Sequence, residues 1–173
     1  CNQKRIPLVF LQDVTGFMVG SKSEHGGIIK DGAKMVNAMA NSTVPKFTVI
    51  IGNSYGAGNY AMCGKAYDPR LIVAWPTARI AVMGGEQASD VLLNLEKNRL
   101  EKLGERISES KKKTLKKQIK KNYDLQTSPY YAASRLWIDQ IIHPLDTRKY
   151  ISVGIEASNN NKLREFKTGV FQT

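Results

Sequence analysis

The sequence predicts an α/β fold built around a parallel sheet. Continuous apolar runs, typical of strands that are covered on both faces, recur along the chain. Segments with apolar residues at helical spacing separate these runs, and this alternation is typical of the α/β class. A length of 173 residues is enough to bury a core of its own. We therefore expect a single domain over residues 1–173.

The first half of the chain contains two expected strands and two expected helices. The apolar run 7–12 predicts a strand, and the glycine-rich stretch 13–27 predicts a loop. Small and apolar residues at helical spacing predict a helix over 28–41, which a proline ends. A second strand over 46–51 then leads through a glycine cluster into a helix that we expect to contain Cys63.

The second half continues the alternation. Strands are expected over 71–75 and 78–83, and Gly84-Gly85 then gives way to a long helix that ends at about Arg106. Ser108 suits the N-cap of the next helix, because its hydroxyl can accept a bond from a first-turn amide. We expect this helix to end at about Tyr123 and a further segment to start at Ser128-Pro129. The secondary structure of 134–142 is ambiguous, and a helix is expected over 147–159.

The net charge of +11 raises the possibility of a nucleic-acid partner. The charge is local, however, because residues 96–121 hold nine Lys, two Arg and four Glu, a net +7 that leaves +4 elsewhere. Apolar residues at helical spacing predict that one side of this region faces the core, and lysines fill the other side. A solvated helix face is the preferred interpretation, with docking of an acidic partner as the alternative. The apolar positions are Leu100, Leu103, Ile107, Leu115, Ile119 and Tyr123.

Other compositional features exclude several classes of protein. No apolar run approaches the ~20 residues of a membrane span. Two cysteines, Cys1 and Cys63, are too few for a disulfide framework or a metal-ligand pattern, which favours a reducing compartment. The chain begins abruptly before its first apolar run, so we expect it to be a piece of a longer protein.

The stretch 49–64, VIIGNSYGAGNYAMCG, runs from β-branched residues into a glycine cluster, and three functions fit such a corner. The first is a serine esterase, because GNSYG around Ser54 matches G-x-S-x-G between a strand and a helix. His25 and two following glycines imitate the upstream oxyanion loop of those enzymes. The candidate base is His143. Its nearest upstream acid, Asp139, is only four residues away, which disfavours a triad.

The second possibility, a phosphate cradle, lacks its motifs, because neither G-x-x-x-x-G-K-[ST] nor G-x-G-x-x-G occurs here. The third is a backbone anion site at the helix start Gly56-Ala57-Gly58. Small residues let a ligand approach the main chain, and unpaired first-turn amides carry partial positive charge toward it. One well-placed donor of this kind stabilises a transition state by roughly 3 kcal/mol. Glycines required only for helix–strand packing are the structural alternative.

Five blocks of sequence carry a family resemblance. In chain order they are PLVFLQDVTGFMVG, GGIIKDGAKMVNAMA, IIGNSYGAGNYAMCGKAYDPR, AWPTARIAVMGGEQA and SPYYAASRLWIDQIIHPLDTRK. They resemble the carboxyltransferase (β) subunit of biotin-dependent acyl-CoA carboxylases, with the methylcrotonyl-CoA carboxylase branch most similar. The resemblance covers nearly all 173 residues of this chain. Within the family's β subunit, it covers only the C-terminal half.

The resemblance implies a crotonase-like (ClpP-like) superhelix of ββα units. It also implies transfer of a carboxyl group from carboxybiotin to an acyl-CoA, with 3-methylcrotonyl-CoA as the expected substrate and leucine catabolism as the setting. The implied catalytic groups are the amides of Ala57 and Gly58, which would hold negative charge on the biotin ureido oxygen. The remaining implied site residues are Thr15, Gly16, Phe17, Tyr55 and Gly56 for biotin, and Tyr60 for the acyl substrate.

The resemblance also implies partners. Biotin is expected to arrive on an α subunit, and an N-terminal half and further copies in a hexamer should complete the active site. The isolated chain is therefore expected to be inactive. The expected location of the enzyme is the bacterial cytoplasm or the mitochondrial matrix. No metal, membrane or nucleic acid is expected to take part. The open alternatives are a propionyl-CoA, geranyl-CoA or glutaconyl-CoA carboxyltransferase, the Ser54 esterase, and a scaffold for assembly.

Overall fold

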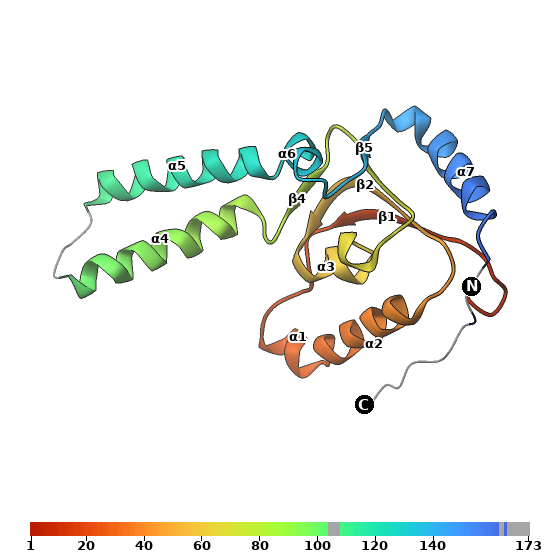
Figure 1. Ribbon diagram of the computed structural model, residues 1–173. Helices are drawn as coiled ribbons and strands as arrows, with labels where there is room; N and C mark the ends of the chain where they lie inside the picture. Colours follow the sequence, from red (N-terminus) through yellow and green to blue (C-terminus); the bar gives the residue numbers. More distant parts are fainter. Residues whose placement is uncertain (104–107, 163–164, 166–173) are drawn as a thin grey trace.

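The computed structural model describes residues 1–103, 108–162 and 165. Its centre is a five-stranded sheet in the order β1-β2-β3-β5, and β4 pairs with the last three residues of β2 (Figure 1). Every strand pair is parallel, so the predicted α/β class is confirmed. The strands are β1 Leu8–Val14, β2 Lys46–Tyr55, β3 Leu71–Ala74, β4 Arg79–Ala81 and β5 Gln140–Ile141.

Helices cover the sheet on both sides. In Figure 1, α2 lies below the strands and α7 lies above them, while α4 and α5 form a hairpin that projects away from the sheet. The helices are α1 Ser21–His25, α2 Ile28–Asn41, α3 Gly56–Ala61, α4 Gly85–Lys102, α5 Glu109–Gln126, α6 Pro129–Ser134 and α7 Thr147–Ser158. Two 3₁₀ turns, η1 Lys65–Tyr67 and η2 Pro144–Asp146, complete the described elements.

The sheet buries side chains on both faces because successive residues of a strand point to opposite sides. Ile50, Ile72 and Ala74 form one cluster with Ala132 of α6. Val49 and its neighbours form a second cluster on the other face, against α7. A parallel sheet covered on both faces requires continuous apolar strands, which explains why the apolar runs located β3 and the start of β2.

Several boundaries differ from the sequence-based expectations. Helix α2 has the predicted bounds, but the short helix α1 forms inside the stretch predicted to be a loop. Helix α4 is described to Lys102, and the predicted end at Arg106 lies outside the described residues, as does Ile107. Strand β5 forms within the ambiguous stretch 134–142 because it pairs with β3.

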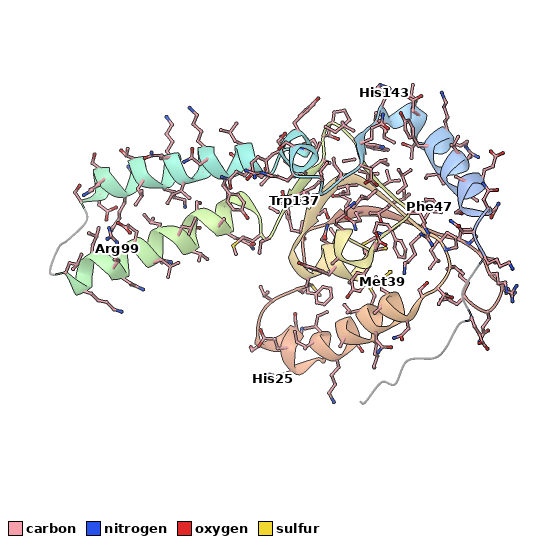
Figure 2. The ribbon with its side chains drawn as sticks, viewed as in Figure 1. His25, Met39, Phe47, Arg99, Trp137 and His143 are labelled. Atoms are coloured by element: carbon pink, nitrogen blue, oxygen red, sulfur yellow. The ribbon has the colours of Figure 1, made fainter. Side chains whose placement is uncertain are left out.

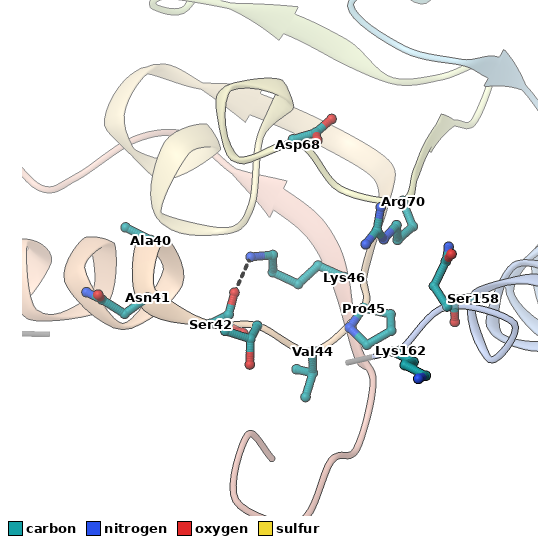
Figure 3. A pocket seen from close by; sticks show the side chains of 12 residues that line it. Ala40, Asn41, Ser42, Val44, Pro45, Lys46, Asp68, Arg70, Ser158 and Lys162 are labelled. Atoms are coloured by element: carbon teal, nitrogen blue, oxygen red, sulfur yellow. Dashed lines mark hydrogen bonds between the residues drawn. The ribbon is translucent and has the colours of Figure 1, made fainter. Parts of the chain in front are cut away.

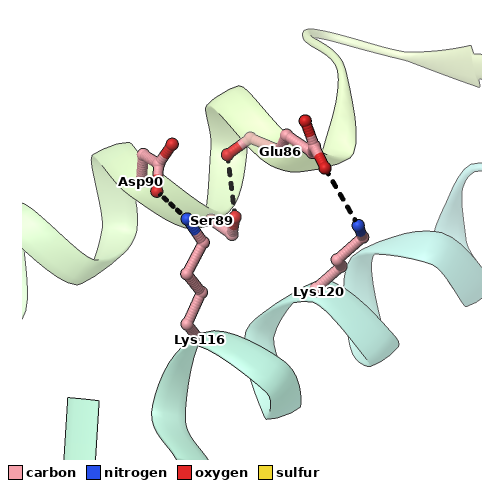
Figure 4. Close-up of polar contacts among 5 residues, drawn as sticks. All are labelled: Glu86, Ser89, Asp90, Lys116 and Lys120. Carbon is pink, nitrogen blue, oxygen red and sulfur yellow. Dashed lines mark hydrogen bonds and ion pairs between the residues drawn. The ribbon is translucent and has the colours of Figure 1, made fainter. Parts of the chain in front are cut away.

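The α4–α5 hairpin is held by contacts between its own two helices. Lys116 pairs with Asp90, and Lys120 lies 3.3 Å from Glu86 (Figure 4). Ser108 caps α5 as predicted, accepting a bond from the Lys111 amide at 3.3 Å.

The apolar stripe of the hairpin is only partly buried. Leu100 is buried, but Leu103, expected to face the core, is 65% exposed. The expectation for Leu103 is wrong because this end of the hairpin projects away from the sheet (Figure 1).

Candidate functional site

The glycine cluster lies at the carboxyl end of β2, where ligands bind in open parallel sheets. The strand was expected to stop at residue 51, yet it continues to Tyr55. Pairing explains the extension, because β4 aligns Asn53, Ser54 and Tyr55 with its own three residues and Val14 of β1 aligns with Ser54. The turn therefore comes directly at Gly56, where α3 begins.

Helix α3 requires glycine at two positions. Gly56 has φ +55°, and a Cβ there would lie 2.9 Å from the Val82 carbonyl oxygen. Gly58 is buried, and a Cβ there would lie 2.5 Å from Val14 Cγ2. The start of α3 thus packs tightly on β1, which supports a packing role for these glycines whatever else they do.

The first turn of α3 leaves main-chain amides without partners inside the helix. Ala57, between the two glycines, is exposed, so a ligand can reach this residue. Tyr60, one turn further on, is 52% exposed. The helix ends at Ala61, and Cys63 follows it with φ +60°, so the expectation of Cys63 inside a helix is wrong. A positive φ is incompatible with the α-helix.

The loop after β1 reaches the same corner. Gly16 has φ +111°, and a Cβ built on Gly58 would lie 3.3 Å from the Gly16 Cα. The ring of Phe17 packs on α2, where a Cβ at Gly32 would lie 2.1 Å from the ring. Thr15 is exposed. The structure therefore brings Gly16 together with the first turn of α3, while Phe17 is anchored on α2.

Tyr55 contributes its main chain to the corner and directs its side chain toward the base of the hairpin. Its ring is 3.9 Å from where a Cβ of Gly84 would lie. Burial raises the pKa of the Tyr55 hydroxyl, and the Arg79 guanidinium partly opposes this effect. The hydroxyl is therefore neutral at physiological pH and can act as a hydrogen-bonding group only.

A buried polar network underlies the corner, and sequence reasoning missed two of its three members. Ser54 Oγ donates to Gln12 Oε1 at 2.6 Å and accepts from Asn59 Nδ2 at 2.6 Å. Gln12 Nε2 donates in turn to the Met62 carbonyl at 2.8 Å. The network ties β1, β2 and α3 together. A polar residue closing the otherwise apolar run 7–12 was the one signal that could have indicated Gln12.

The same network rejects the esterase alternative. Ser54 is 0% exposed, and its two polar partners are amide side chains. The proposed base, His143, is exposed and accepts a bond from the Leu145 amide at 3.3 Å, and Figure 2 shows it beside α7, with His25 on the other side of the molecule. Asp139 accepts from the Ile72 amide at 2.8 Å. Serine, histidine and aspartate are each engaged elsewhere.

A carboxylate braces the strand beneath the glycines. Asp13 Oδ1 accepts a hydrogen bond from the Asn53 amide at 2.9 Å, where the register between β1 and β2 shifts. A Cβ on Gly52 would lie 2.5 Å from the same oxygen, so Gly52 lets the carboxylate reach the backbone. Asp13 thereby replaces a ladder bond that the irregularity removes.

The described part of the chain contains no group of three or more His, Cys, Asp or Glu side chains that could hold a metal ion. It also contains no helix that is both long and apolar enough to cross a bilayer.

Comparisons with known proteins concern almost the whole chain. Residues 1–171 match the family described as carboxyl transferase domain. The chain is 51% identical over 172 residues to the probable mitochondrial methylcrotonoyl-CoA carboxylase beta chain of Drosophila melanogaster, covering 99% of this chain and 30% of that one. It is 48% identical to the biotin-dependent 3-methylcrotonyl-coenzyme A carboxylase beta1 subunit of Mycobacterium tuberculosis, covering 99% and 32%. The chain thus spans less than a third of the length of these relatives.

Solved structures agree with this result. The beta subunit of geranyl-CoA carboxylase from P. aeruginosa superposes with a TM-score of 0.83 at 40% identity, covering 100% of this chain and 32% of that subunit. Transcarboxylase 12S superposes with a TM-score of 0.80 at 35% identity, covering 96% and 30%. These neighbours are carboxyltransferase subunits with a crotonase-like fold, so the predicted fold is confirmed, as is the predicted resemblance.

Proposed function

The chain belongs to the carboxyl transferase domain family, and from that premise we propose that it forms the biotin-facing part of an acyl-CoA carboxyltransferase. The reaction would move a carboxyl group from carboxybiotin to an acyl-CoA. The observation that carries the proposal is the close approach of Gly16 to Gly58 beside Ala57, the exposed residue in the first turn of α3 at the carboxyl end of the sheet.

The residues at this corner fit a biotin head group. Glycines at 16, 56 and 58 remove the side chains that would otherwise crowd the main chain. The amides of Ala57 and Gly58 would donate to the ureido oxygen and hold the negative charge that develops there, as an oxyanion hole does. Thr15, Gly16, Phe17, Tyr55 and Gly56 would border the head group.

When bound, biotin would supply the carboxyl group and a ureido nitrogen able to accept a proton from the acyl-CoA. This division of labour fits the chain, because Ser54, His143 and Asp139 are all engaged in structural contacts. The chain's own task is to donate main-chain hydrogen bonds and to hold the head group in place. The Gln12–Ser54–Asn59 network supports this task by fixing α3 against β1 and β2.

We propose 3-methylcrotonyl-CoA as the acyl substrate. Relatives named for methylcrotonyl-CoA reach 48% to 51% identity, whereas a propionyl-CoA carboxylase beta chain and a methylmalonyl-CoA carboxyltransferase reach 37% and 38%. Tyr60 is the candidate for substrate discrimination because it is exposed one turn after the glycines.

The proposal includes a longer subunit and partners. The remaining part of that subunit would supply the thioester-binding groups, and a biotin-carrying α subunit would deliver the cofactor. A hexamer is proposed by analogy with transcarboxylase 12S, whose structure describes hexamer assembly. The relatives in Drosophila and Arabidopsis are mitochondrial, so we propose the mitochondrial matrix for a eukaryotic source and the cytoplasm for a bacterial one.

The test is an assay of the complete subunit with its biotinylated partner against methylcrotonyl-, propionyl-, geranyl- and glutaconyl-CoA. We expect the highest kcat/KM for 3-methylcrotonyl-CoA, with formation of 3-methylglutaconyl-CoA, and no turnover by the 173-residue chain alone. A higher kcat/KM for another ester would overturn the assigned substrate. Carboxylation of none of them would overturn the assigned role. Turnover by the isolated chain would overturn its expected dependence on the rest of the subunit.

A further inference from the structure

Two adjoining hollows lie at the amino ends of β2 and β3, the opposite end of the sheet from the glycine corner. The larger, of about 530 Å³, lies between α7 and the sheet. The smaller, of about 330 Å³, lies between the end of α2 and the end of α7 (Figure 3). Arg70, Ser158 and Asn161 line both, so the two hollows are halves of one bipartite site.

The larger half is apolar. Its lining includes Phe47, Leu71, Val153 and Ala157. Gly154 lets α7 approach the sheet closely, because a Cβ there would lie 2.8 Å from the Phe47 ring. Val153 is nevertheless 58% exposed at the side of this hollow. Removing apolar surface of this kind from water stabilises the complex with an apolar ligand.

The smaller half is cationic. Three cations, Lys46, Arg70 and Lys162, line it against one acid, Asp68, and Lys149 adds a fourth cation in the lining of the larger half. Lys46 is committed to the end of α2, where its Nζ donates to the Ser42 carbonyl at 3.0 Å (Figure 3).

Arg70 and Lys149 remain available for an anion. Among the residues that the structure describes, neither has a carboxylate within ion-pair distance. Arg70 is the cation common to both hollows, so one end of a ligand can meet its guanidinium while the other end meets the apolar lining.

We propose that this bipartite site binds an amphipathic anion, with an apolar body in the larger hollow and a carboxylate or phosphate head on Arg70. A planar guanidinium binds either head through two parallel hydrogen bonds, which a lysine ammonium does not do. The volumes fall in the range of small-molecule sites, about 300–1,000 Å³. None of the lining residues belongs to the proposed carboxyltransfer site, so the inference is independent of that function.

The test is calorimetric titration of the chain with three probes that share one alkyl chain: octanoate, octyl phosphate and the neutral octan-1-ol. We expect at least one anion to bind about tenfold more tightly than octan-1-ol, because a hydrogen bond to a charged group contributes enough free energy to raise the affinity by about that factor. The tighter of the two anions identifies the natural head as carboxylate or phosphate. Equal affinity for all three probes, or no heat with any of them, would overturn the proposal.

Three exposed positions supply variants that keep the fold. Arg70→Gln should weaken binding of the preferred anion about tenfold and leave octan-1-ol unchanged. Val153→Asp should weaken both, because it places a carboxylate beside the apolar body. The matched control is Arg148→Gln, which removes the same charge from α7 at a residue that lines neither hollow. A loss with the control as large as that with Arg70→Gln would show attraction by net charge alone and would overturn the site. Circular dichroism checks that each variant is folded.

Discussion

The sheet body and the α4–α5 hairpin use different means to stay folded. In the body, Val49, Ile50, Ile72 and Val73 are each at most 1% exposed, and helices cover both faces. In the hairpin, α5 has no fully buried residue, and ion pairs join it to α4. The body depends on removal of apolar surface from water, whereas the hairpin depends on helix propensity and weak surface contacts. Position in the architecture, not residue type, should therefore set the effect of a mutation.

The largest expected difference comes from truncating an apolar residue in each region. Ile50→Ala removes a side chain that is 0% exposed and should lower the free energy of unfolding by about 3 kcal/mol. Leu95→Ala in the hairpin removes one that is 59% exposed and should change it by less than about 0.5 kcal/mol. Urea denaturation of both variants measures the two values. Similar losses at the two sites would contradict the contrast.

A second comparison sharpens the role of close packing in the body. Gly58→Ala forces a Cβ to 2.5 Å from Val14 Cγ2, so it should destabilise the protein by about 2 kcal/mol. Gly84→Ala, where the hairpin begins, places its Cβ 3.9 Å from the nearest atom and should be tolerated. Thermal unfolding of the pair tests this. Equal midpoints would mean that the corner has room which the contacts do not show.

The buried network gives a third, smaller effect. Ser54→Ala leaves Gln12 and Asn59 without the hydroxyl that joins them, which should cost about 1.5 kcal/mol. Turnover in the complete enzyme should persist, because the hydroxyl is not a nucleophile. The measurement is kcat alongside the unfolding midpoint. Loss of activity in a folded variant would restore the serine to the mechanism.

The smallest effect is expected at the ion pair of the hairpin. Lys116→Ala removes the partner of Asp90, and an exposed ion pair of this kind contributes little to stability. The loss should shrink in high salt, which screens exposed charges. Unfolding at low and high salt, with Lys117→Ala as the control on the same helix, measures it. An effect that high salt leaves unchanged would contradict the surface character of the pair.

The same contrast explains what the sequence could predict. Periodicity located α2 with its correct bounds, because a covered helix needs regularly spaced apolar residues. It placed the end of β2 too early, because the strand continues through glycine and serine by pairing with β4 and β1, a tertiary effect. The glycine corner was recognisable from its residues. The hydrogen bond from Gln12 to the Asn59 carbonyl spans 47 positions of the chain, and the bond from Asn59 to Ser54 spans 5. No local sequence pattern encodes the longer of these two bonds.

The most direct test of the central claim replaces one main-chain N–H by an ester oxygen and leaves every side chain unchanged. In the complete subunit, glycolic acid in place of glycine at position 58 turns that amide into an ester, and a first-turn amide has no helical partner to lose. The matched control is the same replacement at Gly85, in the first turn of α4. Our account predicts that kcat falls roughly 10²–10³-fold at position 58, with assembly intact and the control unchanged. A kcat within about twofold of the unmodified enzyme would contradict it.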